Sequence, residues 1–330
     1  MRAISYKNTE TNIPTCGNLH ESLPYGVAYE TDTHFVHFYC SLDGWWVLNT
    51  GMTALESKEG TLEDWVTRVF GATEICEISN GVGDTFKSIW RPGLSFDSMV
   101  YDGVGSSMTS RHQGLITIRI LLKKLEDILE YVELSDISLH TYSHKSRELL
   151  ILACTEVENQ FQRYMSELNI PAIGRNYSTS DYVKLFSPLH LSEFKMHLKP
   201  YPVVGDIVPF GVWDANQPTR SLEWYDAYNK TKHNRDEHFD KATILNCIHA
   251  ICATIVLFSV RHSPYAINTE TSITQSLFQQ LFLIKMPSLD QSSWYVPKII
   301  LPEDVRRDLF CFDGSSDRYM EPWATRLFAI

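Results

Sequence analysis

The N-terminal third of the chain alternates short apolar runs with turn residues, a pattern typical of a mixed α/β region. The runs HFVHFYCSL and WWVLNT flank Asp43 and Gly44, a pair that suits a type I′ turn, so the sequence predicts a β-hairpin. Further on, TLEDWVTRVFG offers Thr61 as an N-cap and Gly71 as a stop, which predicts a short helix. Residues 1–108 are therefore expected to form a mixed α/β N-terminal region.

From about residue 113 the apolar positions recur every three to four residues, which predicts amphipathic helices. LITIRILLKKLEDILEYVEL carries one such stripe, and SHKSRELLILACTEVENQFQRYMSELN carries a second that ends before Pro171. Two more helices are expected, one starting near Ser221 and one over about 240–260. Together these segments predict a helical core over residues 109–262.

The connection near 170–220 is too long for a simple loop and is rich in proline and aromatic residues. Within it, EFKMHLKP alternates apolar with polar side chains, which predicts a half-buried strand or an extended arm. Residues 263–330 predict a mixed C-terminal tail. The expected fold class is α+β, with a mainly helical bundle core, an α/β N-terminal region, an extended insertion and that tail.

Composition restricts the class of protein. The formal net charge of −11 over 330 residues argues against a protein that coats nucleic acid non-specifically, because such binding needs many Lys and Arg side chains. The seven cysteines are scattered, with no Cys-x-x-Cys pair, which favours reduced thiols in a cytoplasmic protein. The apolar run Ile244 to Val260 contains Asn246 and His249, so it predicts a buried helix and no membrane contact.

The stretch WYDAYNKTKHNR, residues 224–235, is the main candidate for chemistry. If it is helical, Asn229 and His233 share a face, with Tyr225 one turn earlier. A histidine there could act as a general base or acid near neutral pH, with Asn229 beside it. Substrate binding is assigned to the neighbouring cations and to the tyrosine: Lys230, Lys232, Arg235 and Tyr225. The alternative is that these residues form the polar end of a buried helix.

The preceding helix offers Glu148, Glu156 and Glu158 as acids that could orient His233 or pair with Lys232. Glu156 is preferred as the orienting acid, because it lies next to an apolar position and four residues before a glutamine. No metal site is predicted, because the histidines lack the spacing that shared ligation needs.

The region of about 110–262 resembles the HEPN superfamily of prokaryotic helical domains. The resemblance rests on SRELLILACTEVE and, after an insertion, WYDAYNKTKHNRDEHFDKATILNCIHAICA. It implies a HEPN-like helical core and no cofactor. Many members are metal-independent ribonucleases of toxin, defence or stress systems, and others are inactive scaffolds. Active members place an Arg and a His, separated by a short spacer, at a dimer interface. Here the positions at that spacing before His233 hold Asp226, Ala227 and Tyr228.

The leading hypothesis is RNA binding, or metal-independent RNA cleavage, within a prokaryotic defence or stress system. The protein would act as a homodimer or with a partner protein. The alternative is a non-catalytic HEPN-like scaffold or dimerisation protein, in which the same polar residues fix helix contacts. A nucleotide-sensing module is a third option.

Overall fold

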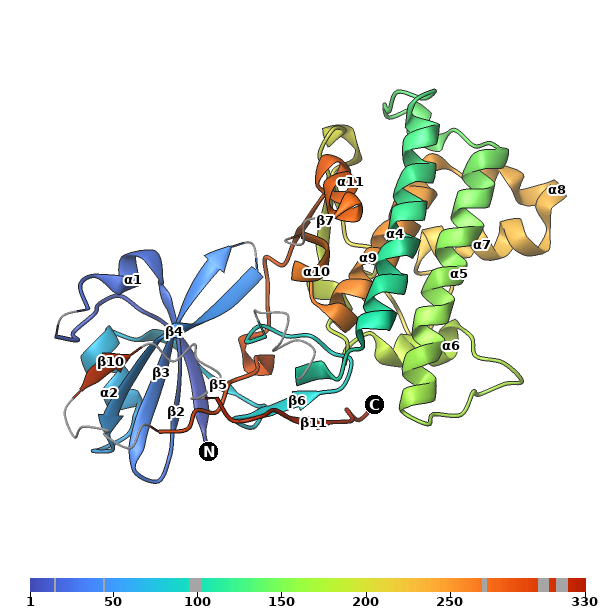
Figure 1. Cartoon of the computed structure of the whole chain (residues 1–330). Coiled ribbons are helices and arrows are strands. Elements are labelled where there is room, and N and C mark those ends of the chain that lie inside the picture. Colours follow the sequence, from blue (N-terminus) through green and yellow to red (C-terminus); the bar gives the residue numbers. More distant parts are fainter. Residues whose placement is uncertain (15, 44, 95–102, 269–271, 302–308, 313–319) are drawn as a thin grey trace. The chain divides into compact units, whose positions relative to one another are not determined.

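The computed structural model describes residues 1–330 except 15, 44, 95–102, 269–271, 302–308 and 313–319, and it describes no side chains for 42–51 and 310–312. The described chain forms two compact units (Figure 1). The first contains residues 1–106 and 288–326, and the second contains 107–287 and 327–330. The described part of the protein is mixed α and β and contains two antiparallel sheets.

The first unit is built on a six-stranded antiparallel sheet in the order β10-β4-β3-β2-β1-β5 (Figure 1). Its strands are β1 (Ala3–Lys7), β2 (Tyr25–Glu30), β3 (His34–Asp43), β4 (Trp45–Ser57), β5 (Thr73–Ile78) and β10 (Phe310–Phe312). The predicted hairpin is present as the antiparallel pair β3 and β4, and Gly44 at its turn lies outside the described residues. A second, parallel pair joins β6 (Asp84–Phe86) to β11 (Ala324–Arg326).

Both faces of β3 are buried in the part whose side chains are described, which explains its nearly continuous apolar run. One face of that strand, with Val36 and Phe38, packs with the C-terminal residues Trp294 and Val296. The other face packs on α2 (Leu62–Phe70). The predicted caps of α2 are confirmed: its N-cap threonine accepts a hydrogen bond from the backbone N–H of the third helical residue, and its C-cap glycine adopts φ 56°, which glycine tolerates best.

The second unit is mainly helical. Its helices are α4 (Met108–Leu129), α5 (His144–Glu167), α6 (Thr179–Tyr182), α7 (Glu223–His233), α8 (Arg235–His238), α9 (Ile244–His262), α10 (Tyr265–Asn268) and α11 (Ile273–Leu281). Helix α9 contacts α4, α5 and α7, and it forms the centre of the unit (Figure 1).

Helix α9 is buried over nearly its whole length, as its apolar sequence predicted. Among the described residues it is the one helix with the length and apolar composition to cross a membrane, and 89% of that window is buried within the protein. Its N-cap Thr243 accepts a hydrogen bond from the backbone N–H of Asn246 at 3.2 Å. The side chain of Asn246 donates to the backbone oxygen of Lys241 at 2.9 Å, so this polar residue is satisfied inside the unit.

The connection between α5 and α7 belongs to the helical unit. Its residues Lys195–Leu198 form β7, the strand expected from the alternating pattern, which buries Met196 and Leu198. Strand β7 pairs with β8 (Asp206–Ile207) and with β9 (Phe282–Lys285) in a three-stranded antiparallel sheet. The segment predicted as one tail, 263–330, is divided between the units at Pro287, because β9 is held by β7 whereas the following residues pack on the six-stranded sheet.

Candidate functional site

Helix α7 carries most of the predicted site residues, and its sequence explains its ends. Acidic residues occupy its first turn and basic residues its last turn, an arrangement that complements the helix dipole. It buries five residues, Trp224, Tyr225, Ala227, Tyr228 and Thr231. The chain leaves the helix at Asn234, where φ is −139° and ψ is 79°.

The buried face of α7 holds a polar network with α5. The carboxylate of Glu158 accepts hydrogen bonds from the hydroxyls of Tyr225 at 2.6 Å and Tyr228 at 3.1 Å. The Lys232 ammonium donates to the Tyr228 hydroxyl at 2.7 Å and lies 3.9 Å from Glu158 Oε2. Burial, followed by the charge of Glu158, raises the pKa of Tyr225, so this phenol stays protonated. The hydrogen bond to Tyr228 is the main cause that raises the pKa of Lys232.

This network corrects two predicted roles. Tyr225, expected to bind substrate, is 4% exposed and its hydroxyl is committed to Glu158. Glu156, expected to orient His233, instead accepts a hydrogen bond from Gln160 at 3.3 Å, while Glu148 pairs with Lys124 at 2.6 Å. The acid that reaches α7 is Glu158. The sequence feature that could have identified Glu158 is its position four residues after the buried Cys154, one helical turn along the same face of α5.

Asn229 and His233 follow Tyr225 at successive spacings of four, so they lie on a face of α7 that adjoins the one in contact with Glu158. Asn229 is half-buried and His233 is exposed. Neither side chain forms a hydrogen bond within the described part of the chain, and the two are not bonded to each other. On the same face, Lys230 pairs with Asp226 at 2.5 Å. The histidine is therefore an accessible titratable group of α7 with no hydrogen-bond or ion-pair partner among the described residues.

Arg235 begins the short helix α8 directly after α7 and is exposed. Its guanidinium lies 5.6 Å from the ring centre of Phe239, and no carboxylate in the described ranges comes within 4 Å of it. Of the three predicted phosphate-binding cations, Lys230 and Lys232 are engaged within α7 and α5, whereas Arg235 has no ion-pair partner among the described residues.

Aromatic residues from a distant segment pack against Phe239, the ring that Arg235 contacts, and no pattern in the sequence indicated them. Tyr142 contacts Phe239 edge-on, with ring centres 5.7 Å apart, and His144 lies 5.0 Å from the same ring. These residues are almost a hundred positions apart in the chain, so no local pattern could bring them together. We call Tyr142, His144, Phe239 and Arg235 the aromatic platform.

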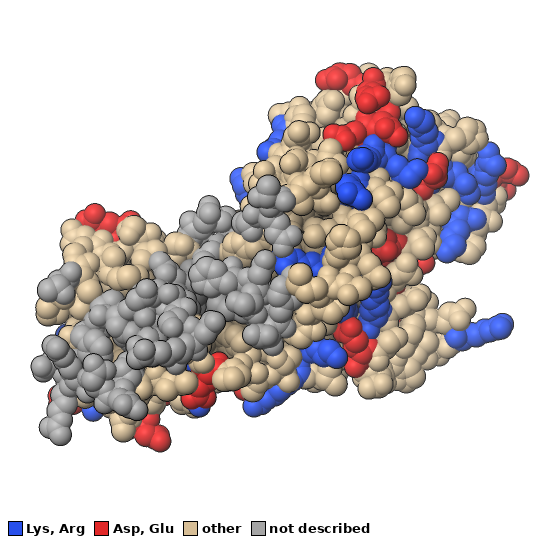
Figure 2. All heavy atoms as spheres, in the orientation of Figure 1, with Lys and Arg blue, Asp and Glu red and all other residues tan. Residues whose placement is uncertain are grey.

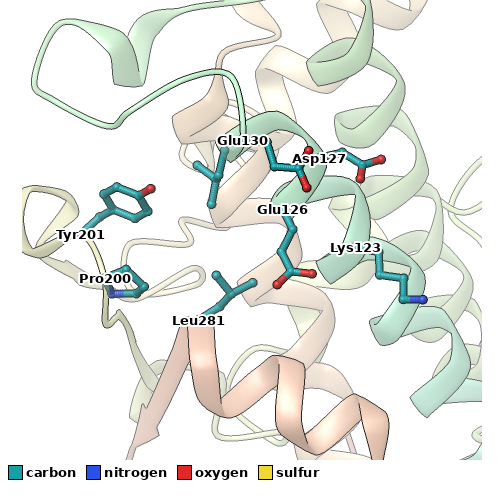
Figure 3. Close-up of a pocket in the computed structure, with 8 residues that line it drawn as sticks. Lys123, Glu126, Asp127, Glu130, Pro200, Tyr201 and Leu281 are labelled. Carbon is teal, nitrogen blue, oxygen red and sulfur yellow. The ribbon is translucent and has the colours of Figure 1, made fainter.

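A separate hollow of about 540 Å³ lies between α4 and the residues after β7 (Figure 3). In Figure 3, Pro200 and Tyr201 lie on one side and the α4 side chains on the other. Those α4 side chains include Glu126, Asp127 and Glu130, against one ammonium from Lys123. Its acidic lining is unfavourable for a phosphate ligand.

Basic and acidic side chains are interspersed over most of the face of the helical unit drawn in Figure 2. No group of three or more His, Cys, Asp or Glu residues is arranged to hold a metal ion within the described ranges. The chain matches no protein-family model, no curated protein and no solved structure.

Proposed function

We propose that this protein binds RNA at the C-terminal end of α7, with a HEPN-like helical core, as a cytoplasmic component of a prokaryotic defence or stress system. The observation that carries the proposal is the exposure of His233 beside Arg235, a cation with no carboxylate within 4 Å in the described structure. An arginine in this state can pair with a phosphate through two parallel hydrogen bonds. The contacts of α9 with α4, α5 and α7 support the helical core that the resemblance implies.

A catalytic version of the function uses His233 as a general base. The imidazole would take the proton of a ribose 2′-hydroxyl, whose oxygen then bonds to the adjacent phosphorus as the bond to the 5′ oxygen breaks. The leaving oxygen would receive a proton from the histidinium or from water. Asn229, one turn away, would orient the imidazole or the phosphate, and Arg235 would stabilise the charge on the phosphorane. This chemistry requires no metal or cofactor, and a homodimer would bring two such helix ends together.

The rival function is a non-catalytic scaffold or dimerisation protein. The network of Glu158, Tyr225 and Tyr228 favours it for the inner face of α7, because these groups satisfy one another and fix the contact between α5 and α7. That network does not include Asn229, His233 or Arg235. The rival therefore accounts for Tyr225 and Lys232, two of the seven predicted site residues, and leaves the exposed end of the helix unexplained.

RNA binding is tested by fluorescence anisotropy with a labelled oligoribonucleotide at low salt. Arg235→Gln should weaken binding by roughly 5- to 10-fold, since a charge-assisted contact to phosphate contributes about 1 kcal/mol or more. Arg175→Gln is the matched control, because Arg175 is also exposed and follows the far end of α5. Absence of binding by the unchanged protein, or an equal loss in both variants, would remove the proposal.

Cleavage is tested by incubating the protein with total RNA in EDTA. His233→Ala should abolish cutting and keep RNA binding, while His112→Ala, a change at another exposed histidine of the same unit, should leave both unchanged. Equal RNA profiles for the protein and the His233 variant would leave only the binding function.

A further inference from the structure

The aromatic platform is an exposed cluster of rings that the fold holds in place. Tyr142 is 48% exposed, His144 is exposed, and Phe239 is partly buried beneath them. A folded protein has no need to leave such rings at the surface to stabilise its core, since exposed apolar area is better buried. Rings that are positioned but accessible are typical of a binding surface.

Backbone contacts fix the two segments that carry the rings. Tyr142 and Thr243 form an antiparallel bridge, and the backbone N–H of Ile244 donates to the oxygen of Thr141 at 2.9 Å. Ser143 caps α5 immediately after Tyr142, in a reciprocal capping box with Ser146. The tyrosine and histidine therefore flank a helix cap and hold their positions without help from a ligand.

The charge around the platform is balanced. Glu237 accepts a hydrogen bond from Asn234 at 2.6 Å, and Asp240 pairs with Lys241 at 2.9 Å, so part of the local acidic charge is already engaged. Residues 232–241 include three lysine or arginine residues and three acidic residues. Attraction of phosphates alone would give weak binding here, and a second source of affinity is needed for RNA to bind.

We infer that the aromatic platform binds unpaired bases of the RNA by stacking, with Arg235 placed to contact their phosphates or stack beside them. The inference rests on the proposed function and names its ligand class. Stacking on aromatic rings requires a base whose face is free, which single-stranded nucleotides offer and duplex interiors do not. A site with aromatic rings and few unpaired cations binds single strands by base stacking. It binds a duplex weakly, because few cations are free to contact the phosphates.

The inference is tested by anisotropy with a single-stranded oligoribonucleotide and with the same strand annealed to its complement. The unchanged protein should bind the single strand at least about 10-fold more tightly. Tyr142→Leu, which removes the ring and keeps an apolar side chain, should weaken single-strand binding by roughly 5-fold or more, since stacking of one base contributes about that much. Arg235→Lys keeps the charge and loses the planar group, and it should cost about 2- to 5-fold.

Tyr201→Leu is the matched control, because Tyr201 lines the acidic hollow of the same unit. It should leave RNA binding unchanged, and circular dichroism establishes that each variant folds. Equal affinity for single strand and duplex, with Tyr142→Leu and Arg235→Lys both neutral, would overturn the inference while leaving RNA binding in place. Failure of the unchanged protein to bind either form would overturn both the inference and the proposed function.

Discussion

Two adjoining faces of α7 carry similar polar residues that differ in their hydrogen-bond partners. On the inner face, Tyr225, Tyr228 and Lys232 meet Glu158 from α5, and their hydrogen-bonding groups are satisfied within the protein. The outer face adjoins the inner one and carries the half-buried Asn229 and the exposed His233, and neither makes a side-chain hydrogen bond within the described residues. One helix of eleven residues thus contains both a structural network and a candidate ligand site.

The comparison teaches that residue type does not decide the role of a polar side chain; its available partners do. A buried hydroxyl that loses its acceptor pays the full cost of desolvation, whereas an exposed imidazole exchanges freely with water. Substitutions on the inner face should therefore change the free energy of unfolding, and those on the outer face should change ligand binding.

The largest expected effect is at Glu158. Glu158→Ala leaves the hydroxyls of Tyr225 and Tyr228, which are 4% and 0% exposed as residues, without their acceptor. We expect a loss of about 2 to 4 kcal/mol in the free energy of unfolding. Urea unfolding followed by far-ultraviolet circular dichroism, to which the helical unit contributes most, measures this loss.

Glu156→Ala is the control for that experiment, because Glu156 lies two residues away on the same helix and its side chain hydrogen-bonds only to Gln160 among the described residues. We expect a change of about 0.5 kcal/mol or less. Similar losses in the two variants would show that the inner network does not hold α7 to α5.

The next largest effect depends on pH and extends the comparison to α9. Burial lowers the pKa of His249 to about 4, below its ordinary value of about 6.5 in an unfolded chain. As the pH falls through 6.5, the unfolded chain therefore takes up a proton that the folded protein does not, and stability is lost. The loss is about 1.4 kcal/mol per pH unit, or about 2 kcal/mol at pH 5, and it continues until about pH 4.

His249→Gln removes this site of proton uptake and should make the dependence of stability on pH less steep, while the buried His262 and His37 still contribute to it. The quantity to measure is the change in unfolding free energy between pH 7 and pH 5, which should be about 2 kcal/mol smaller in the variant. Because each protein is compared with itself, a general loss of stability in the variant does not affect the result. If the unfolding free energy falls equally with pH in the two proteins, His249 does not cause the loss of stability.

The fold was predictable where local signals are strong. The caps of α2, the β3 and β4 pair and the boundaries of α5 and α7 follow from turn residues and apolar spacing, which act within a few residues. The division of residues 263–330 between two units was not predictable, because it depends on the pairing of β9 with β7, about ninety residues away. Periodicity contains no information about such distant partners.

The candidate site shows the same limit. Helical spacing places Asn229 and His233 on one face, but Tyr225 precedes Asn229 by four residues, so spacing alone cannot say where the buried face ends. Tyr225 was assigned to a ligand because its real partner, Glu158, comes from another helix. Tyr142 and Phe239 were missed for the same reason, since only the folded chain brings them together.

The smallest expected effect on stability is at His233 itself. Its exposed side chain has no partner in the described structure, so His233→Ala should change the free energy of unfolding by about 0.5 kcal/mol or less. Tyr228→Phe, on the inner face of the same helix, removes the hydroxyl between Glu158 and Lys232 and should cost about 1 to 2 kcal/mol. Urea unfolding of both variants under one set of conditions compares their losses in the free energy of unfolding. An equal loss of stability in the two variants would mean that His233 stabilises the fold. The outer face of α7 would then have the same structural role as the inner face.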